Sequence, residues 1–499
     1  MEPKLDLVLV HPGGKHQTYQ SLAKELAAAE PPVWAGLMAS HARVRGLSVE
    51  ILDAEVYDLS PDVVAERVAE RNPRLVAVVV YGHQPSASTQ NMSAAGAICT
   101  AIKQREPDRS VLLVGGHAAA LPERTLREEA ADFVCDGEGP STVVALAQAL
   151  RETAPDFSKV PGLWYRDGDK QRSTAPAPNL TDLDREMPGI AWDLLPMARY
   201  RAHNWHCFGG VERQPYAALY TTLGCPYRCT FCCIQAPFKR GETLLNLAPR
   251  ANSYRMWSPE AVVRQIDHIV EKYGVKNIKI ADEMFVLNPK HVNGICDLLI
   301  ERGHGLNIWA YARVDTIREG MVDKLLRAGF RWVALGIEAA SEHVRDEVDK
   351  GFTQKEVYRT VERLRAAGIS VIANYIFGLP EDTHETMKDT LKLALELNTE
   401  FANFYSTMAY PGSPLYRTAL DRDWRLPEHW SGYSQHSRDS LPLPTNYLTA
   451  GEVLKFRDDA FLTYFTSPSY LEMVERRFGT DTVRHVREMT SHRLERTNA

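Results

Sequence analysis

The chain has 499 residues, of which 44% are apolar and 24% are charged, and its formal net charge is -6. This length predicts two to four domains with at least two sizeable cores. The acidic balance, without a long basic run, argues against a nucleic-acid partner held mainly by phosphate contacts. The apolar run near the N-terminus is too short for a signal peptide, and no segment has the length of apolar residues that crosses a bilayer. We therefore expect a cytoplasmic protein with reduced thiols and no membrane span.

The first third, residues 1–150, alternates apolar runs with helical stretches such as SPDVVAERVAERNP. Each run ends in glycine or polar residues, which predicts a doubly wound α/β sheet whose ligand lies across the carboxyl ends of the strands. No G-x-G-x-x-G pattern follows the first run, so a dinucleotide is not expected, and a plain docking domain is the alternative. The five runs are LDLVLVHPGG, LSVEILDAEV, RLVAVVVYG, SVLLVGGHA and ADFVCDGEG.

The next segment, residues 151–205, is rich in Pro, Asp and Arg and contains DGDKQRSTAPAPNLTDLDREMPGIAWDLLP. This composition predicts a hairpin followed by a linker. The linker would join the first third to a second domain over residues 206–420.

Four of the eight cysteines fall within nine positions, in the stretch TTLGCPYRCTFCCIQAPF at residues 221–238. Cys225, Cys229 and Cys232 form the pattern C-x3-C-x2-C on a loop that leaves a strand, so three thiolates can converge on one small group. Structural zinc usually takes four ligands, commonly from two knuckles, and no second knuckle exists here. A thioredoxin-like pair would leave Cys225 unexplained. Three thiolates on a four-iron cluster would leave one iron open to a substrate, with Cys233 as a small apolar neighbour.

Six further β-type runs alternate with helical segments between residues 206 and 420, which predicts a parallel sheet built from β–α units. The segment SPEAVVRQIDHIVEKYG opens with a Ser-Pro start signal and closes with Gly274. Ligands of parallel sheets built from β–α units sit at the carboxyl ends of the strands, so polar residues there are candidate site residues. The runs are 217–223, 277–282, 307–313, 332–338, 370–378 and 401–410.

The last segment, residues 421–499, begins as an aromatic loop and continues as amphipathic helices. We expect the aromatic stripe of the helices to be core packing, and the loop is a candidate cover for the mouth of the barrel. The stripe is Phe456, Phe461, Tyr464 and Phe465, and the loop holds Trp430, Tyr433 and His436.

The stretch CPYRCTFC resembles the signature of the radical SAM superfamily, including an aromatic residue, Phe231, before the third cysteine. The resemblance implies a partial (β/α)6 barrel and a 4Fe-4S cluster on Cys225, Cys229 and Cys232. It also implies that the open iron chelates the amino and carboxylate groups of S-adenosylmethionine (SAM). An electron from the cluster then breaks a carbon–sulfur bond and releases a 5′-deoxyadenosyl radical.

The polar strand ends are similar to the places where radical SAM enzymes hold the ribose, the aminoacyl end and the adenine of SAM. Arg313 is suited to the carboxylate of SAM, because its guanidinium presents two donors together. Glu338 is suited to the ribose hydroxyls or the ammonium. The alternative is that such residues cap helices or form salt bridges within the barrel. The expected SAM contacts are Phe231, Asp282, Glu283, Arg313, Glu338, Ser341 and Gly378.

The loops of the first third resemble the cobalamin-binding domain of one large class of radical SAM enzymes. YGHQPSAST (81–89), GGHAAALPE (115–123) and DGEGPST (136–142) match its glycine- and hydroxyl-rich turns. The D-x-H-x-x-G element that supplies an axial histidine elsewhere is absent after the first strand, so we expect the lower face of cobalt to be vacant or water-bound. DTHETM, from Asp382, is expected to start a helix instead. The expected cobalamin contacts are His11, Gly13, Gly14, Gly82, Ser86, Ser88, Thr89, Gly115, Gly116, His117, Leu121, Gly137, Glu138 and Gly139.

The two resemblances together cover residues 4–420 and imply an α/β protein with three parts. These are an N-terminal doubly wound, Rossmann-like cobalamin-binding domain, a partial (β/α)6 radical SAM barrel and a helical C-terminal extension. They imply a cobalamin-dependent radical SAM methyltransferase that acts on an unactivated carbon, or on phosphorus, of a small molecule. An external donor such as flavodoxin or ferredoxin would supply electrons.

In that family one SAM methylates cobalt and a second yields the adenosyl radical, which takes a hydrogen atom from the substrate; the substrate radical then collects the methyl group. Three alternatives remain. One is a radical rearrangement, oxidation or cyclisation with both cofactors but no methyl transfer. The second is a non-catalytic cobalamin and redox sensor. The third, an RNA methylthiotransferase, is disfavoured because the front domain lacks a second cysteine cluster.

Overall fold

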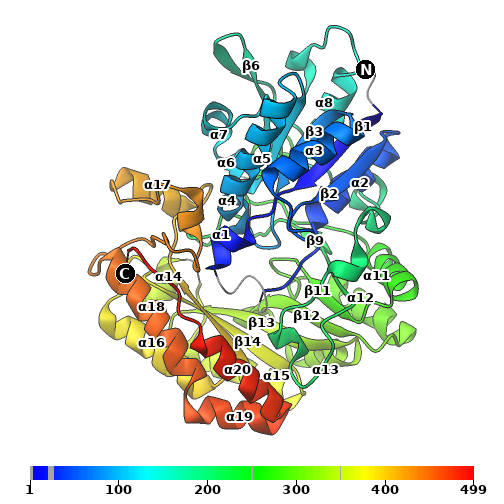
Figure 1. Cartoon of the computed structure of the whole chain (residues 1–499). Coiled ribbons are helices and arrows are strands. Elements are labelled where there is room, and N and C mark those ends of the chain that lie inside the picture. Colours follow the sequence, from blue (N-terminus) through cyan, green and yellow to red (C-terminus); the bar gives the residue numbers. More distant parts are fainter. Residues whose placement is uncertain (1–3, 21–26, 249–250, 349, 499) are drawn as a thin grey trace.

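The structure is a computed structural model that describes residues 4–20, 27–248, 251–348 and 350–498. Two α/β bodies face each other, and the C-terminal helices lie along the second body (Figure 1). Among the described residues, no helix is both long enough and apolar enough to span a membrane.

The first body, called the front domain here, contains a seven-stranded sheet in the order β2-β1-β3-β4-β5-β6-β7. Strands β1 to β5 are parallel, and their runs of Val, Leu and Ile are largely buried, as expected for a sheet covered on both faces. The strand order reverses at β1 and β3, whose carboxyl ends open the crevice where such folds bind ligands. The predicted doubly wound sheet is confirmed. The strands are β1 (Leu5–His11), β2 (Val49–Asp53), β3 (Pro73–Val80), β4 (Ser110–Gly115), β5 (Phe133–Cys135), β6 (Leu163–Asp167) and β7 (Lys170–Ser173).

The hairpin predicted within the linker is present as β6 and β7, and it pairs antiparallel with β5. The front sheet therefore reaches Ser173, past the expected boundary near residue 150. The physical reason is that β5 would otherwise end the sheet with unpaired backbone groups, which β6 satisfies.

The helices of the front domain cover both faces of its sheet. Side chains of α2 and α8 share one apolar core with one face of β1 and β3, and side chains of α3 and α5 share a second core with the opposite face. This two-sided packing is what the periodicity predicted. The helices are α1 (Lys15–Tyr19), α2 (Val33–Val44), α3 (Pro61–Arg71), α4 (Ala87–Gln90), α5 (Met92–Arg105), α6 (Gly116–Ala120), α7 (Pro122–Glu128), α8 (Pro140–Ala149) and α9 (Leu183–Glu186).

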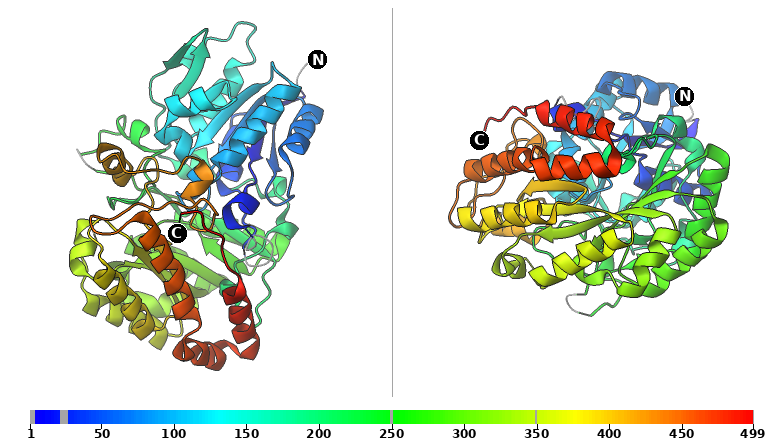
Figure 2. Two further views of the ribbon diagram at one scale, coloured as in Figure 1. Left: turned by 60° about the vertical axis from the view of Figure 1, so that its left-hand side comes forward. Right: turned by 90° about the horizontal axis from the view of Figure 1, so that it is seen from below.

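The second body is a six-stranded, all-parallel sheet in the order β15-β14-β13-β12-β11-β8. It curls into a partial barrel with helices outside (Figure 2, right). Its edge strands β8 and β15 do not pair with each other, so the barrel is open on one side. The strands are β8 (Tyr216–Leu219), β11 (Asn277–Ile280), β12 (Asn307–Arg313), β13 (Phe330–Glu338), β14 (Ser370–Phe377) and β15 (Phe401–Ser406).

All six predicted barrel runs form strands, with one difference in the first. The run over 217–223 is divided, because β8 stops at Leu219 and a short β9 (Thr222–Leu223) pairs antiparallel with β10 (Arg255–Met256). Between them the backbone N–H of Thr221 donates to the Asp282 carboxylate at 2.6 Å. This side-chain bond replaces a ladder bond and turns the chain toward the cysteine loop.

The signals predicted for two of the barrel helices are confirmed. The helix α11 follows the Ser258 cap and ends at the left-handed Gly274, and α16 begins after a capping box at Thr383, which confirms DTHETM as a helix start. The helices are α10 (Lys239–Glu242), α11 (Pro259–Tyr273), α12 (Pro289–Arg302), α13 (Glu319–Arg327), α14 (Glu342–Glu347), α15 (Gln354–Ala366), α16 (His384–Leu397) and α17 (Pro414–Asp421).

The C-terminal helices are α18 (Ala450–Phe465), α19 (Pro468–Phe478) and α20 (Thr480–Ser491). They lie beside the edge strand β15 and helix α16 (Figure 2). Tyr464 and Phe465 are fully buried, and Phe456 and Phe461 pack against the same core, so the aromatic stripe is core packing as predicted. Short 3-10 turns lie at 157–159, 192–194, 197–199, 205–207, 314–316 and 430–433.

Candidate cofactor and substrate site

The three motif cysteines lie on the loop after β9, at the carboxyl end of the barrel sheet. Side chains outside the motif hold this loop in place. The N–H of Cys225 donates to Gln235 Oε1 at 3.0 Å, and Asn252 Nδ2 donates to the carbonyls of Cys225 at 3.0 Å and Tyr227 at 2.7 Å. These hydrogen bonds therefore fix the shape of the cysteine loop independently of a bound metal.

None of the eight cysteines, all of which the structure describes, forms a disulfide. Burial raises the pKa of Cys225 to about 12 and raises that of Cys232 well above its ordinary value, so these thiols keep their protons until a metal cation displaces them. Within the described part of the chain, no group of three or more His, Cys, Asp or Glu side chains is arranged to hold a single metal ion. In an iron–sulfur cluster each thiolate binds a different iron, so the three cysteines fit a cluster better than mononuclear zinc.

Two cations lie beside the cysteine loop, and one of them is Arg313. Its guanidinium stacks 3.9 Å from the centre of the Tyr227 ring and donates to Asp315 at 3.0 and 3.2 Å. Its Nη1 is buried and has no hydrogen-bond partner. An orphaned guanidinium donor at this position suits a carboxylate ligand, as predicted for SAM.

The other cation is Lys350, whose Nζ lies 2.7 Å from Glu338 Oε1 in a buried ion pair. Glu338 has φ 65°, in the left-handed region that glycine favours, and the ladder between β13 and β14 shifts register there. Such backbone strain costs about 1–3 kcal/mol and gathers at functional sites. A Cβ on Gly336 would come within 2.6 Å of the Glu338 carboxylate, so glycine leaves room for this pair.

The other predicted SAM contacts have different surroundings. Asp282 accepts from both Thr221 and Thr222, Ser341 caps α14, and Gly378 packs against Val453 of α18, where a Cβ would come within 2.4 Å. Phe231 packs against two small apolar clusters. Of the predicted SAM contacts, Glu283, Arg313 and Glu338 lie around the cysteine loop. Asp282, Ser341 and Gly378 instead make contacts within the fold. Their roles toward SAM stay predictions.

A small pocket, called the seam pocket here, lies between the front domain and the cysteine loop. Its volume is about 30 Å³, which is room for one small group, so a corrin would need these loops to separate. The front domain contributes five of the predicted cobalamin residues, and the barrel side contributes Glu283, whose pKa burial raises to about 8. The five are Gly82, Ser88, Thr89, Gly116 and His117.

His117 is the residue of the seam pocket that has a buried polar atom without a hydrogen-bond partner. Its Nδ1 is 3.2 Å from Thr89 Oγ1, its ring lies edge-on to Trp430 at 4.3 Å, and its buried Nε2 has no partner. Burial lowers the pKa of His117 to about 3, so the ring is neutral. Ser88 accepts from the His117 N–H at 2.9 Å and donates to the Val80 carbonyl. A neutral donor or acceptor left open at this seam fits an amide of a cobalamin side chain.

The remaining predicted cobalamin residues do not line the seam pocket. Glu138 pairs with Arg255 at 2.8 Å and accepts from the N–H of Leu180, and Gly139, at φ 110°, packs against Met38. Leu121 packs against a small apolar cluster of the chain after the barrel, Ser86 precedes α4, and His11 is buried at the end of β1. Gly13 and Gly14 form the loop after β1. Their roles toward cobalamin also stay predictions.

Two of these glycines differ in the space around them. A Cβ on Gly115 would come within 2.1 Å of the Val80 carbonyl, whereas a Cβ on Gly137 would meet nothing within 4 Å. We expect Gly115→Ala to destabilise the front domain by about 1–3 kcal/mol through overpacking, and Gly137→Ala to leave stability unchanged. Urea unfolding of both variants checks this, and equal stability of the two would contradict the close approach of β3 and β4.

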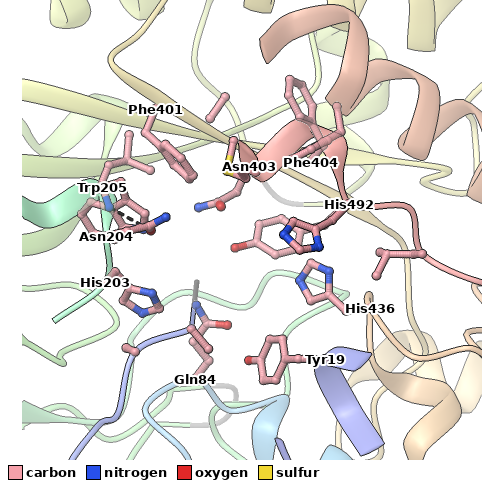
Figure 3. A pocket seen from close by; sticks show the side chains of 18 of the residues that line it. Tyr19, Gln84, His203, Asn204, Trp205, Phe401, Asn403, Phe404, His436 and His492 are labelled. Atoms are coloured by element: carbon pink, nitrogen blue, oxygen red, sulfur yellow. Dashed lines mark hydrogen bonds between the residues drawn. The ribbon is translucent and has the colours of Figure 1, made fainter. Parts of the chain in front are cut away.

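A larger cavity of about 380 Å³, called the barrel cavity here, extends from inside the barrel to the front domain. Its walls come from β12 to β15, the 3-10 turn at 205–207, α1, α18 and the C-terminal tail. Figure 3 shows His203 and Gln84 on one side, Asn403 pointing inward from β15, and His436 and His492 together on another side. Its volume lies in the range of small-molecule sites, about 300–1,000 Å³.

A buried ion-pair network fixes the front domain against this cavity. Glu30, from the segment between α1 and α2, accepts from Tyr216 at 2.9 Å and Lys279 at 3.0 Å, and lies 3.1 Å from His83 Nδ1. Burial alone would raise the pKa of Glu30, but His83 and Lys279 bring that pKa well below its ordinary value. A front-domain carboxylate thus holds two barrel strands, β8 and β11, in register with the front domain.

Several of these residues carry no signal in the sequence. Lys350 and Glu30 sit in ordinary loops, Tyr227 is one of the variable positions between the first two cysteines of the motif, and Asn252 lies after the motif. Gln235 is the exception, because a polar residue inside the apolar stretch CCIQAPF indicates a buried hydrogen bond.

The comparisons with known proteins agree with this geometry. Residues 219–394 match the model of the Radical SAM superfamily, and residues 20–147 match that of the B12 binding domain. The chain is 27% identical over 455 residues to a protein of Pyrococcus horikoshii named as an uncharacterized methyltransferase, covering 91% of this chain and 92% of that protein. It is 29% identical to the anaerobic magnesium-protoporphyrin IX monomethyl ester cyclase of Rubrivivax gelatinosus, covering 82% and 69%.

Two solved structures share the fold. The radical SAM methyltransferase TsrM of Kitasatospora setae, with cobalamin and a [4Fe-4S] cluster bound, superposes with a TM-score of 0.65 at 20% identity, covering 84% of this chain and 75% of that one. The cobalamin-dependent radical enzyme OxsB, with aqua-cobalamin and SAM bound, gives 0.69 at 16% identity, covering 97% and 71%. The arrangement of front domain, barrel and C-terminal helices is therefore an established architecture.

Proposed function

Because the chain belongs to the cobalamin-binding radical SAM enzymes of the methyltransferase type, we propose that it methylates an unactivated carbon, or phosphorus, of a small molecule held in the barrel cavity. One observation carries the proposal. The cavity is walled by barrel strands and by front-domain residues such as Tyr19 and Gln84, so a bound molecule faces both bodies. Gln84 Nε2 also donates to the Tyr311 hydroxyl at 2.9 Å, which joins the two walls directly.

When bound, the cluster supplies the electron that opens SAM and the corrin supplies the methyl group. We assign the cluster to Cys225, Cys229 and Cys232. Arg313 would hold the SAM carboxylate through its orphaned Nη1. The strained Glu338, fixed by Lys350, would accept from hydroxyl or ammonium groups of SAM.

On the facing side, the seam-pocket residues would hold the corrin. His117 Nε2 offers an open hydrogen-bonding position, and Ser88 is already committed to Val80 and His117, so its role is to position the His117 loop. Gly116 lies beside Ser88, whose side chain would be 3.6 Å from a Cβ at that position.

The proposal includes an external electron donor, a flavodoxin or ferredoxin, docking beside the cysteine loop. The segment after the motif leaves large apolar side chains in solvent, with Leu244 50%, Leu247 40% and Met256 37% exposed. Arg228, inside the motif, is an exposed cation on the cysteine loop. An acidic carrier with an apolar contact fits both features. Eight cysteines without a disulfide are compatible with a reducing compartment, and the proposal places the protein in the cytoplasm.

The test is methyl transfer by the anaerobically reduced holoenzyme. Methyl-deuterated SAM is supplied with a small-molecule extract of the source cells, and products are followed by mass spectrometry. We expect a product that carries the deuterated methyl group, together with 5′-deoxyadenosine. Formation of 5′-deoxyadenosine with a consumed substrate and no labelled product would contradict methyl transfer.

A second candidate is a radical oxidation or cyclisation without methyl transfer. It is favoured by the similarity to the magnesium-protoporphyrin IX monomethyl ester cyclase of Rubrivivax gelatinosus over 82% of this chain. Unlabelled product in the same experiment would support it.

A further inference from the structure

The side of the barrel cavity formed by α18 and the C-terminal tail holds two buried guanidinium groups and one carboxylate. The side chains of Arg457 and Arg496 are each 6% exposed. Both contact Asp458, since Arg457 Nη1 donates to this carboxylate at 2.8 Å and Arg496 Nε and Nη2 each donate to it at 2.9 Å. One carboxylate balances only one of two buried cations, so this side of the cavity carries surplus positive charge.

The hydrogen bonds show which guanidinium is left open. Arg496 uses all three of its guanidinium nitrogens, because it also donates to the carbonyls of Gln435 and Ser437, each at 2.9 Å. Arg457, which lines the cavity, donates from Nε to the Phe404 carbonyl at 2.7 Å and from Nη1 to the shared carboxylate. Its Nη2 donates to no group within the described part of the chain. Burial lowers the pKa of Arg457, which is the effect of a charge that its surroundings compensate incompletely.

His436 adds a neutral hydrogen-bonding group beside Arg457. Its Nδ1 is buried, and neither of its ring nitrogens has a hydrogen-bond partner among the residues that the structure describes. Burial and the nearby guanidinium of Arg457 lower the pKa of His436 to about 3, so the ring is neutral and carries one N–H. The ring stacks on Tyr19 with centres 5.3 Å apart, and it lies beside His492 (Figure 3). This stacking fixes the ring in the wall of the cavity.

The other carboxylates that line the cavity lie away from this side. Glu30 is bound by side chains of β8 and β11, whereas Arg457 is bound to β15, at the opposite edge of the barrel sheet. Glu55 belongs to the front domain and has Lys15 of the same domain nearby. Arg493, an exposed cation of the C-terminal tail, also lines the cavity. The surplus positive charge beside α18 is therefore available to a ligand.

From this arrangement we propose that the substrate carries an anionic oxygen group, a carboxylate or a phosphoryl group, that binds Arg457 and His436 in the barrel cavity. A guanidinium forms charge-assisted hydrogen bonds with either group, and a buried cation gains most from a ligand that completes its charge balance. Arg457 would be the specificity-determining residue. This inference rests on the proposed function, because it names the substrate class of the same site.

The test uses four aryl probes, added to the unreduced holoenzyme and followed by ligand-observed NMR. Benzoate, benzamide and benzamidine have nearly the same shape and are anionic, neutral and cationic at neutral pH, and phenylphosphonate offers a phosphoryl group instead. SAM is added at saturation so that Arg313, which is proposed to hold the SAM carboxylate, does not compete for the anions.

We expect benzoate or phenylphosphonate to bind at least about tenfold more tightly than benzamide and benzamidine. The tighter of the two anions identifies the group as a carboxylate or a phosphoryl group. Failure of both anions to bind more tightly than benzamide and benzamidine would overturn the inference.

Variants locate the binding. Arg457→Met removes the open guanidinium but leaves Asp458 paired with Arg496, so no buried carboxylate loses all its partners. It should weaken binding of the preferred anion by at least about tenfold and leave the weaker binding of benzamide almost unchanged. Arg457→Lys keeps the charge and should retain part of the preference. His436→Phe keeps a ring against Tyr19 and should weaken anion binding about fivefold.

Arg477→Met is the matched control. Arg477 and Arg365 share the carboxylate of Glu400, at 2.7 and 3.0 Å, and neither arginine lines the barrel cavity. The control therefore changes the total charge by the same amount and also leaves the carboxylate one guanidinium, and it should keep anion binding. Iron and corrin contents show that each variant is folded.

Two results with these variants would also overturn the inference. One is unchanged anion binding in folded Arg457→Met, and the other is an equal loss of anion binding in Arg477→Met, which would indicate a general effect of charge. If Arg457→Met does not retain its cofactors, His436→Phe decides, and unchanged anion binding in that variant would refute the site.

Failure of this inference and failure of the proposed function are separable. Probe binding is measured without turnover, whereas the function is judged by SAM cleavage and by labelled methyl transfer in the absence of probes. An enzyme that transfers methyl groups but binds no anion at Arg457 would refute only the substrate class. Anion binding at Arg457 without labelled methyl transfer to a consumed substrate would refute only the function.

Discussion

Replacing Cys225, Cys229 and Cys232 together by Ala should remove the iron of the anaerobically purified protein, from about four atoms per chain to near zero, and leave its corrin content unchanged. The cysteines lie on the barrel side, and the seam-pocket residues of the front domain contribute no thiol ligand. Formation of 5′-deoxyadenosine from SAM under strong reduction should fall to background. Iron, sulfide and corrin analyses with a SAM cleavage assay measure both effects.

Cys296→Ala is the matched control, because this thiol is buried in the barrel wall away from the loop. It should keep iron and SAM cleavage. Cys233→Ala tests the neighbour that the motif leaves out, and it should also retain the cluster. Iron without corrin in the wild-type protein would mean that the front domain has been misinterpreted, and the methyltransferase proposal would fall with it.

The second large effect is expected at Glu30. Glu30→Gln leaves the Lys279 ammonium, 2% exposed, without its carboxylate at 3.0 Å. Breaking a buried ion pair costs about 3–5 kcal/mol, and we expect the lower end because the Glu30 side chain is 25% exposed. Urea unfolding at neutral pH measures the loss. Glu428→Gln, which breaks an exposed pair with Arg425, should cost no more than about 1 kcal/mol.

The pH dependence gives a second readout for Glu30. The folded-state pKa of Glu30 lies below its ordinary value of 4.5, so its ionised form stabilises the fold above that pH, and this contribution is lost as the pH falls. The stability difference between wild type and Glu30→Gln should therefore shrink on acidification. Adding Lys279→Met to Glu30→Gln should restore much of the stability, because the uncompensated charge is gone. A constant difference at all pH values would contradict the ion-pair origin.

Most of the fold was predictable because its signals are local. Alternating apolar runs and helix caps, such as Ser258 before α11, mark elements through contacts a few residues apart. The linker hairpin shows the limit. Its turn is visible in the sequence, but its pairing with β5 depends on an open sheet edge that only the assembled front domain presents.

The candidate site also has features that the sequence predicted and features that only the tertiary structure shows. Arg313 and Asp282 look alike in sequence, since both are polar residues at strand ends. In the structure Arg313 keeps a free buried donor beside the cysteine loop, whereas Asp282 accepts from Thr221 and Thr222 within the fold. Which strand-end residue remains open to a ligand depends on neighbours contributed by other strands.

By itself the sequence determined the cysteine triad, the order of the two α/β bodies and therefore the class of chemistry, because each rests on spacing within a short stretch of chain. Only the tertiary structure decided the left-handed backbone of Glu338, its pairing with Lys350 and the contact of Glu30 with Lys279 across 249 positions. These contacts join residues that are far apart in the sequence, because a buried charge is balanced only by the partner that folding brings beside it.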